Sequence, residues 1–277
     1  MLVLIKKIGG ISMKNFKVAI TNDKNEVIME KQIQERGYLF YDKAYNEGDK
    51  ITLTLDQAGQ FVKVKIDDAM AETILFIKGT TWTFEIPSEK NIKVSYPSYA
   101  FAGENHYLSF SIPSEDEVYA YRNLTLNPLD QNKKEEAFPH ASANVETRNE
   151  ATFFARNAID GVLANEDHGF WPYQSWGINR QADAALRVLF GKEVEVDRVG
   201  IALRADFPHD SYWTQATLEF SDGSREVISL EKDKDLQFFD FEKRTIEWIE
   251  IKELIKAEDE SPFPALTQLE VYGRYLK

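Results

Sequence analysis

The stretch that decides the fold class runs Ala202-Leu-Arg-Ala-Asp-Phe-Pro-His-Asp-Ser-Tyr-Trp-Thr-Gln-Ala-Thr-Leu-Glu-Phe-Ser-Asp-Gly-Ser224. A strand-like run at 199–203 leads into a loop, and a second strand-like run follows at 216–220. The turn sequence at 221–224 closes that second strand. The loop places polar groups that can hydrogen-bond hydroxyls beside flat aromatic faces, namely Arg204, Asp206, His209, Asp210, Tyr212 and Trp213.

The first half of the chain alternates between apolar and polar residues with period two. Such alternation is typical of strands with one buried face. Turn-forming residues separate the runs at spacings that fit a β-sandwich or jelly roll. Residues 26–34 are the only serious helix candidate in this half. The expected strands cover residues 16–20, 50–55, 61–66, 73–77 and 82–86.

The chain is long enough for two domains, because it has 277 residues of which 43% are hydrophobic. A proline and a run of polar residues interrupt the strand pattern at 127–136, as a short interdomain linker does. We therefore predict an all-β protein of two β-sandwich domains, residues 13–131 and 132–277.

The composition argues against several classes of partner. The net charge is −13, and so acidic a surface repels phosphate backbones and anionic lipid headgroups. Nucleic acid and membrane surfaces are therefore poor partners, whereas neutral or cationic ligands remain. The chain also has no cysteine, so disulfides and thiolate metal sites are excluded. No stretch is apolar enough to insert into a bilayer.

The start of the chain does not have the sequence of a signal peptide. The apolar run Met1 to Ile5 is too short for a signal core, and Met13 is an alternative start. We therefore expect a cytoplasmic protein, with a secreted protein or a module of a larger secreted polypeptide as the alternative.

The second half carries an ordered set of landmarks, which are Ala158-Ile-Asp-Gly161, Ser175-Trp-Gly177, the Val194–Ile201 strand, and the terminal Leu269–Gly273 strand. In this order they resemble the coagulation-factor type C, or discoidin, domain. That family has a galactose-binding-like jelly roll and shares it with family 32 carbohydrate-binding modules. The resemblance covers residues 138–273, and the first half is not matched.

The resemblance implies a structural calcium ion near the Ala-Ile-Asp-Gly loop. Asp160, Asn165 and Glu270 occupy positions that could match its ligands, and all-oxygen ligation suits Ca²⁺. This chain departs from the family in having Val162 and Leu163 where a small polar residue is usual, and in a longer loop at 166–168. The alternative is that Asp160 caps a turn through backbone amides.

The resemblance also implies a sugar site on loops at one end of the second sandwich. A pyranose stacks its C–H face on an aromatic ring, and charged planar groups hydrogen-bond its hydroxyls. We expect Arg204, His209, Trp171 and Trp213 to converge there, and Trp176 to lie in the core. The complete candidate set is Asp167, His168, Trp171, Arg204, Asp206, His209, Asp210 and Trp213.

Other interpretations stay open for this loop. Arg204 and Asp206 could form a surface ion pair of little energetic weight. The pairs Asp206 with Asp210, and Asp167 with Glu166, could serve a glycosidase as acid and base. Serine and cysteine nucleophile motifs and phosphate-binding loops are missing from the sequence. We therefore predict a non-catalytic carbohydrate-binding protein, with a protein-interaction or adhesion module as the main alternative and a glycan-active enzyme as the weaker one.

Overall fold

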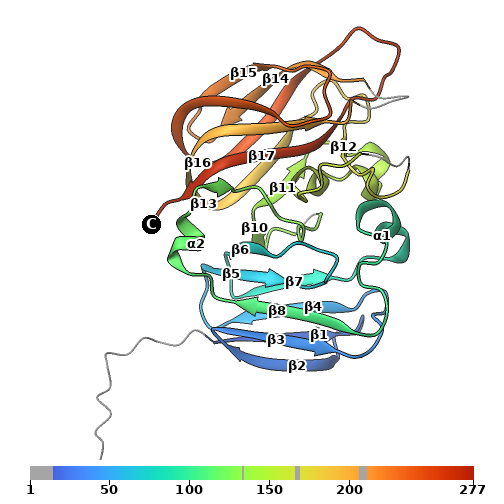
Figure 1. Ribbon diagram of the computed structural model, residues 1–277, viewed down its shortest axis with the longest axis vertical. Coiled ribbons are helices and arrows are strands. Elements are labelled where there is room, and N and C mark those ends of the chain that lie inside the picture. The colour runs from blue at the N-terminus through green and yellow to red at the C-terminus, as the bar shows by residue number, and fades with distance from the viewer. Residues whose placement is uncertain (1–14, 133, 166–168, 206–210) are drawn as a thin grey trace, which may run out of the picture.

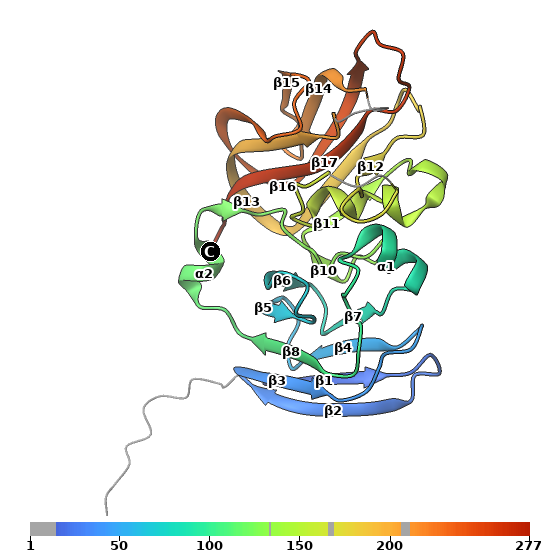
Figure 2. The same ribbon diagram turned by 45° about the vertical axis from the view of Figure 1, so that its right-hand side comes forward.

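The computed structural model describes residues 15–132, 134–165, 169–205 and 211–277. Two β-rich units lie one above the other (Figure 1), and a turned view shows the same arrangement (Figure 2). The N-terminal unit is the lower one in both figures, and the C-terminal unit is the upper one. This agrees with the prediction of two β-sandwich domains.

The N-terminal unit is a sandwich of two antiparallel sheets. The order of the first sheet is β2-β1-β4-β7, and that of the second is β10-β6-β5-β8-β3. The first sheet contains β1 (Asn15–Thr21), β2 (Val27–Gln34), β4 (Lys50–Leu55) and β7 (Thr81–Glu85). The second contains β3 (Arg36–Tyr41), β5 (Gln60–Lys65), β6 (Thr73–Ile77), β8 (His106–Ser111) and β10 (Ala137–Phe138).

The period-two alternation works as expected in the inner strands. In β4, Ile51, Leu53 and Leu55 are buried while the threonines between them are half-buried. The prediction of a helix at 26–34 is wrong, because this segment is strand β2. It is an edge strand with Ile33 as its one fully buried residue, so the sequence shows no alternation from which a strand could be recognised.

Two short helices flank the N-terminal unit. Helix α1 (Glu89–Ser95) begins at Ser88, whose hydroxyl accepts the N–H of Asn91. Helix α2 (Glu115–Tyr119) begins with a capping box formed by Ser114 and Glu117. Figures 1 and 2 both place α1 against the coiled segment that precedes β12 in the C-terminal unit.

The C-terminal unit is built from long antiparallel strands in the order β12-β17-β13-β16-β14-β15. Strand β11 adds to β13, and β9 adds to β17. The strands are β9 (Arg122–Asn123), β11 (His140–Ala143), β12 (Trp176–Gly177), β13 (Leu186–Leu203), β14 (Trp213–Phe220), β15 (Arg225–Ser229), β16 (Gln237–Lys256) and β17 (Ala265–Tyr275). Three 3₁₀ turns precede β12, at η1 (Thr147–Asn149), η2 (Ala151–Phe153) and η3 (Ala155–Ile159).

Strand β13 bends along its length and pairs with β11, β16 and β17. Its first residues pair with β11, nine of its last ten pair with β17, and irregularities in register separate the two parts. Gly191 lies at the bend with φ 75°, and a Cβ there would lie 2.6 Å from the ring of Phe138. Glycine is therefore required for both its backbone angle and its space.

The segment expected to be a polar linker is instead built into both units. Strand β9 pairs with β17 of the C-terminal unit, whereas β10 pairs with β6 of the N-terminal unit. Leu124 belongs to the C-terminal core, and Leu129 belongs to the N-terminal one. The polar residues between them are buried and hydrogen-bonded: Asn127 donates to the Pro139 carbonyl at 2.7 Å.

Arg156 makes hydrogen bonds and an aromatic contact at the joint, that is, the interface between the two units. Arg156 is 4% exposed. Its guanidinium donates to the carbonyls of Asp130 (2.8 Å) and Pro128 (3.0 Å), and it lies 4.6 Å from the ring centroid of Tyr96. Next to it, His140 Nδ1 lies 2.7 Å from the Asp130 carboxylate, and both side chains are buried. A joint of this kind, with its polar groups buried and paired, holds the two units in one arrangement.

None of the helices within the described ranges has the length and apolar character to span a bilayer.

Candidate functional site

The loops at one end of the C-terminal unit enclose a pocket of about 280 Å³, called here the loop-end pocket. The loop that joins β16 to β17 projects from this end beside β12 (Figure 1). The pocket is lined by Thr147, Arg148, Phe153, Tyr173, Gly177, Ile178, Asn179, Arg180, Arg204, Pro262, Phe263, Pro264 and Ala265.

Backbone contacts bring these loops together. The N–H of Arg204, just after β13, donates to the carbonyl of Ala265 at the start of β17 (3.0 Å). The N–H of Asn179 donates to Thr147 Oγ1 at 2.8 Å. Asn179 and Arg180 both have left-handed backbones, with φ 49° and 60°. Two successive non-glycine residues in this region are uncommon and are often associated with functional loops.

Aromatic rings and guanidinium groups alternate in the walls of the loop-end pocket. Phe263 is 48% exposed, with the Arg180 guanidinium 4.7 Å from its ring centroid. Tyr173 is mostly buried, and the Arg204 guanidinium lies 3.6 Å from its centroid. These cation–π contacts fix the guanidinium planes next to flat apolar faces. The pocket thus offers planar hydrogen-bond donors beside an exposed ring.

Arg204 is the predicted ligand residue that lines this pocket, but Trp213 is not a stacking platform. Trp213 is 1% exposed and packs in the core with its ring centroid 6.3 Å from that of Trp176. The assignment of Trp213 to the site is therefore wrong. It is the first residue of β14, and its side chain points inward with the strand. Trp176, expected in the core, is fully buried there.

Trp171 is not among the residues that line the loop-end pocket, and it contacts the N-terminal unit. Its backbone N–H donates to the carbonyl of Lys93 in α1 at 3.1 Å, and its side chain is half-buried. The expected convergence of Trp171 with Arg204 is therefore wrong too. The remaining candidates, Asp167, His168, Asp206, His209 and Asp210, lie outside the described residues.

The sequence interpretation missed Phe263, Tyr173, Asn179 and Arg180. Phe263 stands between two prolines in Pro262-Phe-Pro264, and an aromatic residue held by prolines in a loop is a signal that could have been used. Nothing in the sequence links that segment to residues 173–180, because the two meet only through the fold.

The contacts of Asp160 do not fit a calcium ion. One carboxylate oxygen accepts the N–H of Val162 (2.8 Å) and Nε2–H of Gln268 (2.7 Å), and the other accepts Nε2–H of Gln174 (2.9 Å). Gln268 is fixed in this orientation because its Oε1 accepts the N–H of Gly161 and its Nε2 also donates to Asn157. N–H donors thus surround the carboxylate where a cation would be expected.

The other two predicted calcium ligands have different surroundings. Glu270 accepts a hydrogen bond from Tyr272 Oη at 2.5 Å. Asn165 is buried, and its side-chain amide has no hydrogen-bond partner among the described residues. Within the described ranges, no three acidic, histidine or cysteine side chains form a group that could hold a metal. The hydrogen bond from the N–H of Val162 to Asp160 fits the alternative that Asp160 caps a turn.

We expect removal of divalent cations to leave the protein unchanged. Thermal unfolding in EDTA and in millimolar CaCl₂ should give the same midpoint, because a ligand that does not bind the folded state adds nothing to its stability. The Gln268→Glu variant is the positive control: a second carboxylate beside Asp160 should lower the midpoint in EDTA and allow CaCl₂ to restore it. A midpoint several degrees higher in CaCl₂ for the unmodified protein would contradict the amide-based arrangement.

The protonation of Asp160 should make the stability of the protein depend on pH. Burial raises the pKa of its carboxyl to about 6, and Arg156 and the hydrogen bonds offset only part of this effect. The folded-state pKa is above the unfolded value of 3.8. The protonated Asp160 carboxyl therefore adds to the free energy of unfolding in full below about pH 4, and this addition is lost as pH rises to about 6. The loss is about 3 kcal/mol. We expect the free energy of unfolding in urea to fall with pH across this window in the wild type and to change less in Asp160→Asn. Parallel pH profiles of the two proteins would contradict this assignment.

Comparison with solved structures finds similarity between the C-terminal half and several modules of known structure. It is similar to chitosan-binding module 1 of a chitosanase/glucanase from Paenibacillus sp. IK-5, with 21% identity over 55% of this chain and 99% of that chain and a TM-score of 0.37. It is also similar to the family 32 module of C. perfringens NanJ in complex with galactose, with 23% identity, 48% and 91% coverage, and a TM-score of 0.37.

A third similar structure is the lectin domain of lectinolysin complexed with Lewis B antigen, with 18% identity, 56% and 98% coverage, and a TM-score of 0.39. No family model and no curated protein matches the chain. The aligned half is the one whose landmarks resemble the type C family. The C-terminal unit is built from antiparallel strands and is joined to a second β-sandwich.

Proposed function

We propose that the protein binds carbohydrate, without catalysis, in the loop-end pocket. The observation that carries this proposal is the exposed ring of Phe263, with the Arg180 guanidinium 4.7 Å from its centroid and Arg204 in the same pocket wall. The apolar face of a pyranose would stack on the ring, and the guanidinium N–H groups would donate to neighbouring hydroxyls. The pocket size is close to the lower end of the range for small-molecule sites.

The non-catalytic assignment is supported by the chemistry of the pocket walls. None of its described lining residues is an aspartate or glutamate, and a glycosidase needs two carboxylates across the scissile bond. The histidine–carboxylate pair of His140 and Asp130 is buried at the joint between the units. A general base must reach its substrate, so this pair serves the fold.

A glycan array probed with the intact protein tests the proposal. The array should present one- to four-ring glycans of galactose, N-acetylgalactosamine, fucose, glucose and glucosamine. We expect binding to at least one sugar class, and loss of that binding in Phe263→Ala. The matched control is Phe238→Ala, because Phe238 is 49% exposed, as Phe263 is, but lies on β16 away from the pocket.

One feature favours the alternative of a protein-interaction module. Tyr38, Phe40 and Tyr107 are exposed on neighbouring strands β3 and β8, and the rings of Tyr38 and Tyr107 stack at 5.7 Å. Exposed aromatic clusters are common in protein interfaces. An array without any binding would make this surface the better starting point.

A further inference from the structure

The loop-end pocket belongs to a series of adjoining hollows that reaches the N-terminal unit. A hollow of about 600 Å³, called here the middle hollow, shares Arg148, Phe153 and Tyr173 with the loop-end pocket. It also has Lys90 and Asn91 of α1 in its wall. Both units therefore contribute to its lining.

The middle hollow in turn adjoins a pocket of about 310 Å³ at the junction of the two units, called here the seam pocket. Asn91, Ala151 and Phe154 line both. The three hollows are thus connected through shared walls from the end of the C-terminal sandwich to α1. The half-buried ring of Phe154 lies at the passage between the last two.

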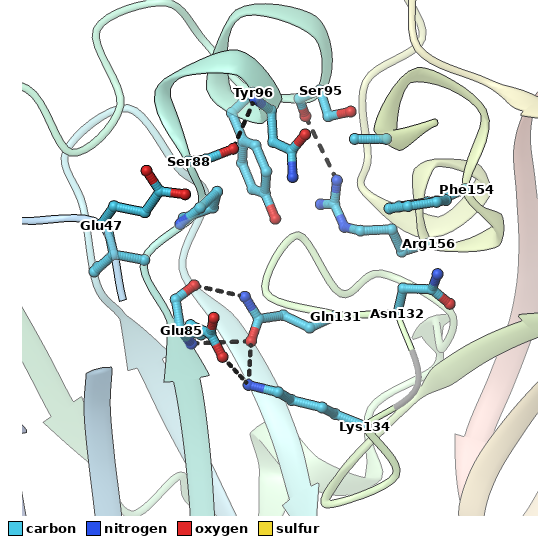
Figure 3. Close-up of a pocket in the computed structure, with 14 residues that line it drawn as sticks. Glu47, Glu85, Ser88, Ser95, Tyr96, Gln131, Asn132, Lys134, Phe154 and Arg156 are labelled. Carbon is cyan, nitrogen blue, oxygen red and sulfur yellow. Dashed lines mark hydrogen bonds and ion pairs between the residues drawn. The ribbon is translucent and has the colours of Figure 1, made fainter. Parts of the chain in front are cut away.

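The seam pocket is preformed. Figure 3 shows Tyr96 and Arg156 on one side facing Glu85, Gln131 and Lys134 on the other. Gln131 Nε2 donates to the Glu85 carbonyl (2.7 Å), and its Oε1 accepts the Glu85 N–H (3.0 Å). These bonds occupy the free edge of β7, and with the Arg156 contacts they fix opposite walls of the pocket.

The charged groups of the seam pocket are largely matched within the protein. Lys134 Nζ contacts Glu85 at 3.5 Å and Gln131 at 3.1 Å, and the Arg156 guanidinium donates to protein carbonyls. In contrast, the Ser95 hydroxyl is buried in the wall and has no hydrogen-bond partner among the described residues. The Tyr96 hydroxyl points into the open space in Figure 3. Hydroxyl groups beside aromatic rings suit a neutral, polyhydroxylated ligand.

We propose that the three hollows form one groove that binds an oligosaccharide, with the first sugar ring in the loop-end pocket and the last in the seam pocket. The inference rests on the proposed function and extends it in two ways. It identifies the ligand as a glycan of several rings, and it gives the N-terminal unit a direct part in binding through α1 and Tyr96. Because buried contacts hold the two units in one arrangement, the groove is ready before the glycan arrives.

Isothermal titration with the best array glycan and its stepwise truncations to one ring tests the groove. The wild type should bind the three- or four-ring form at least about tenfold more tightly than the single ring, since each added hydrogen bond contributes about fivefold. Asn91→Ala and Tyr96→Phe should each lose about fivefold for the long form and leave the single ring unaffected. Lys93→Ala is the matched control, because Lys93 lies on α1 but lines none of the hollows.

The outcomes separate the two proposals. Equal affinity for one ring and four rings, or full retention of long-glycan affinity in both Asn91→Ala and Tyr96→Phe, would overturn the groove while the loop-end site stands. Failure of every glycan length to bind would overturn the groove and the proposed function together. Circular dichroism of the Tyr96→Phe protein checks that it is folded, and the change removes one hydroxyl group.

Discussion

Trp213→Ala should lower the free energy of unfolding by about 3–5 kcal/mol, the usual cost of removing a large buried aromatic side chain. Trp213 is 1% exposed and contacts Trp176 within the C-terminal core. The surrounding strands cannot close the cavity, because β13, β14 and β16 are held in register by their ladders. Urea unfolding followed by circular dichroism measures the effect.

The matched control for Trp213 is Phe263→Ala. Phe263 is an aromatic residue of the same unit but is half exposed, so its loss should change stability by less than about 1 kcal/mol. A Trp213→Ala protein with wild-type stability and no sugar binding would contradict the core assignment. It would restore Trp213 as a ligand-stacking residue.

Arg156→Met should produce the second large effect, again about 3–5 kcal/mol. The change leaves the carbonyls of Pro128 and Asp130 buried without their donor, and each unpaired group costs about 1–3 kcal/mol. Because Arg156 joins the two units, calorimetry should also show two unfolding transitions in the variant where the wild type has one.

Arg148→Met is the matched control for Arg156. Arg148 makes a surface ion pair with Glu150, and its side chain is 62% exposed, so its loss should cost less than about 1 kcal/mol. A single transition in Arg156→Met at the wild-type temperature would contradict the view that the buried joint couples the units.

The strands could be predicted from sequence where one face of each is buried. The alternation in β4 and β5 gives their extent to within one residue. The sequence of strand β2 favours a helix, because most of its side chains are exposed. Without a buried face, apolar and polar residues need not alternate. The first part of the predicted linker at 127–136 differs from the prediction for a related reason: Asn127 and Asp130 are polar, but the fold buries them with hydrogen-bond partners.

The site was harder to predict because its parts are far apart in the sequence. Arg204 was found since it follows a recognisable strand, whereas Phe263 meets it only where β13 and β17 pair. The environment of Asp160 depends in the same way on Gln268, which is 108 residues away. A motif shows that a carboxylate is present but does not show whether a cation or amide groups will surround it.

The most direct test of carbohydrate binding is titration of the best array glycan into the wild type, Phe263→Ala and Phe238→Ala. We predict a single site with Kd about 10⁻⁴ M in the wild type, as expected for a few hydrogen bonds and one stacked ring. Phe263→Ala should weaken binding by about 5- to 150-fold, since a stacking contact is worth about 1–3 kcal/mol. Phe238→Ala should bind as the wild type does. Unchanged affinity in Phe263→Ala would contradict the assignment of the loop-end pocket as the sugar site.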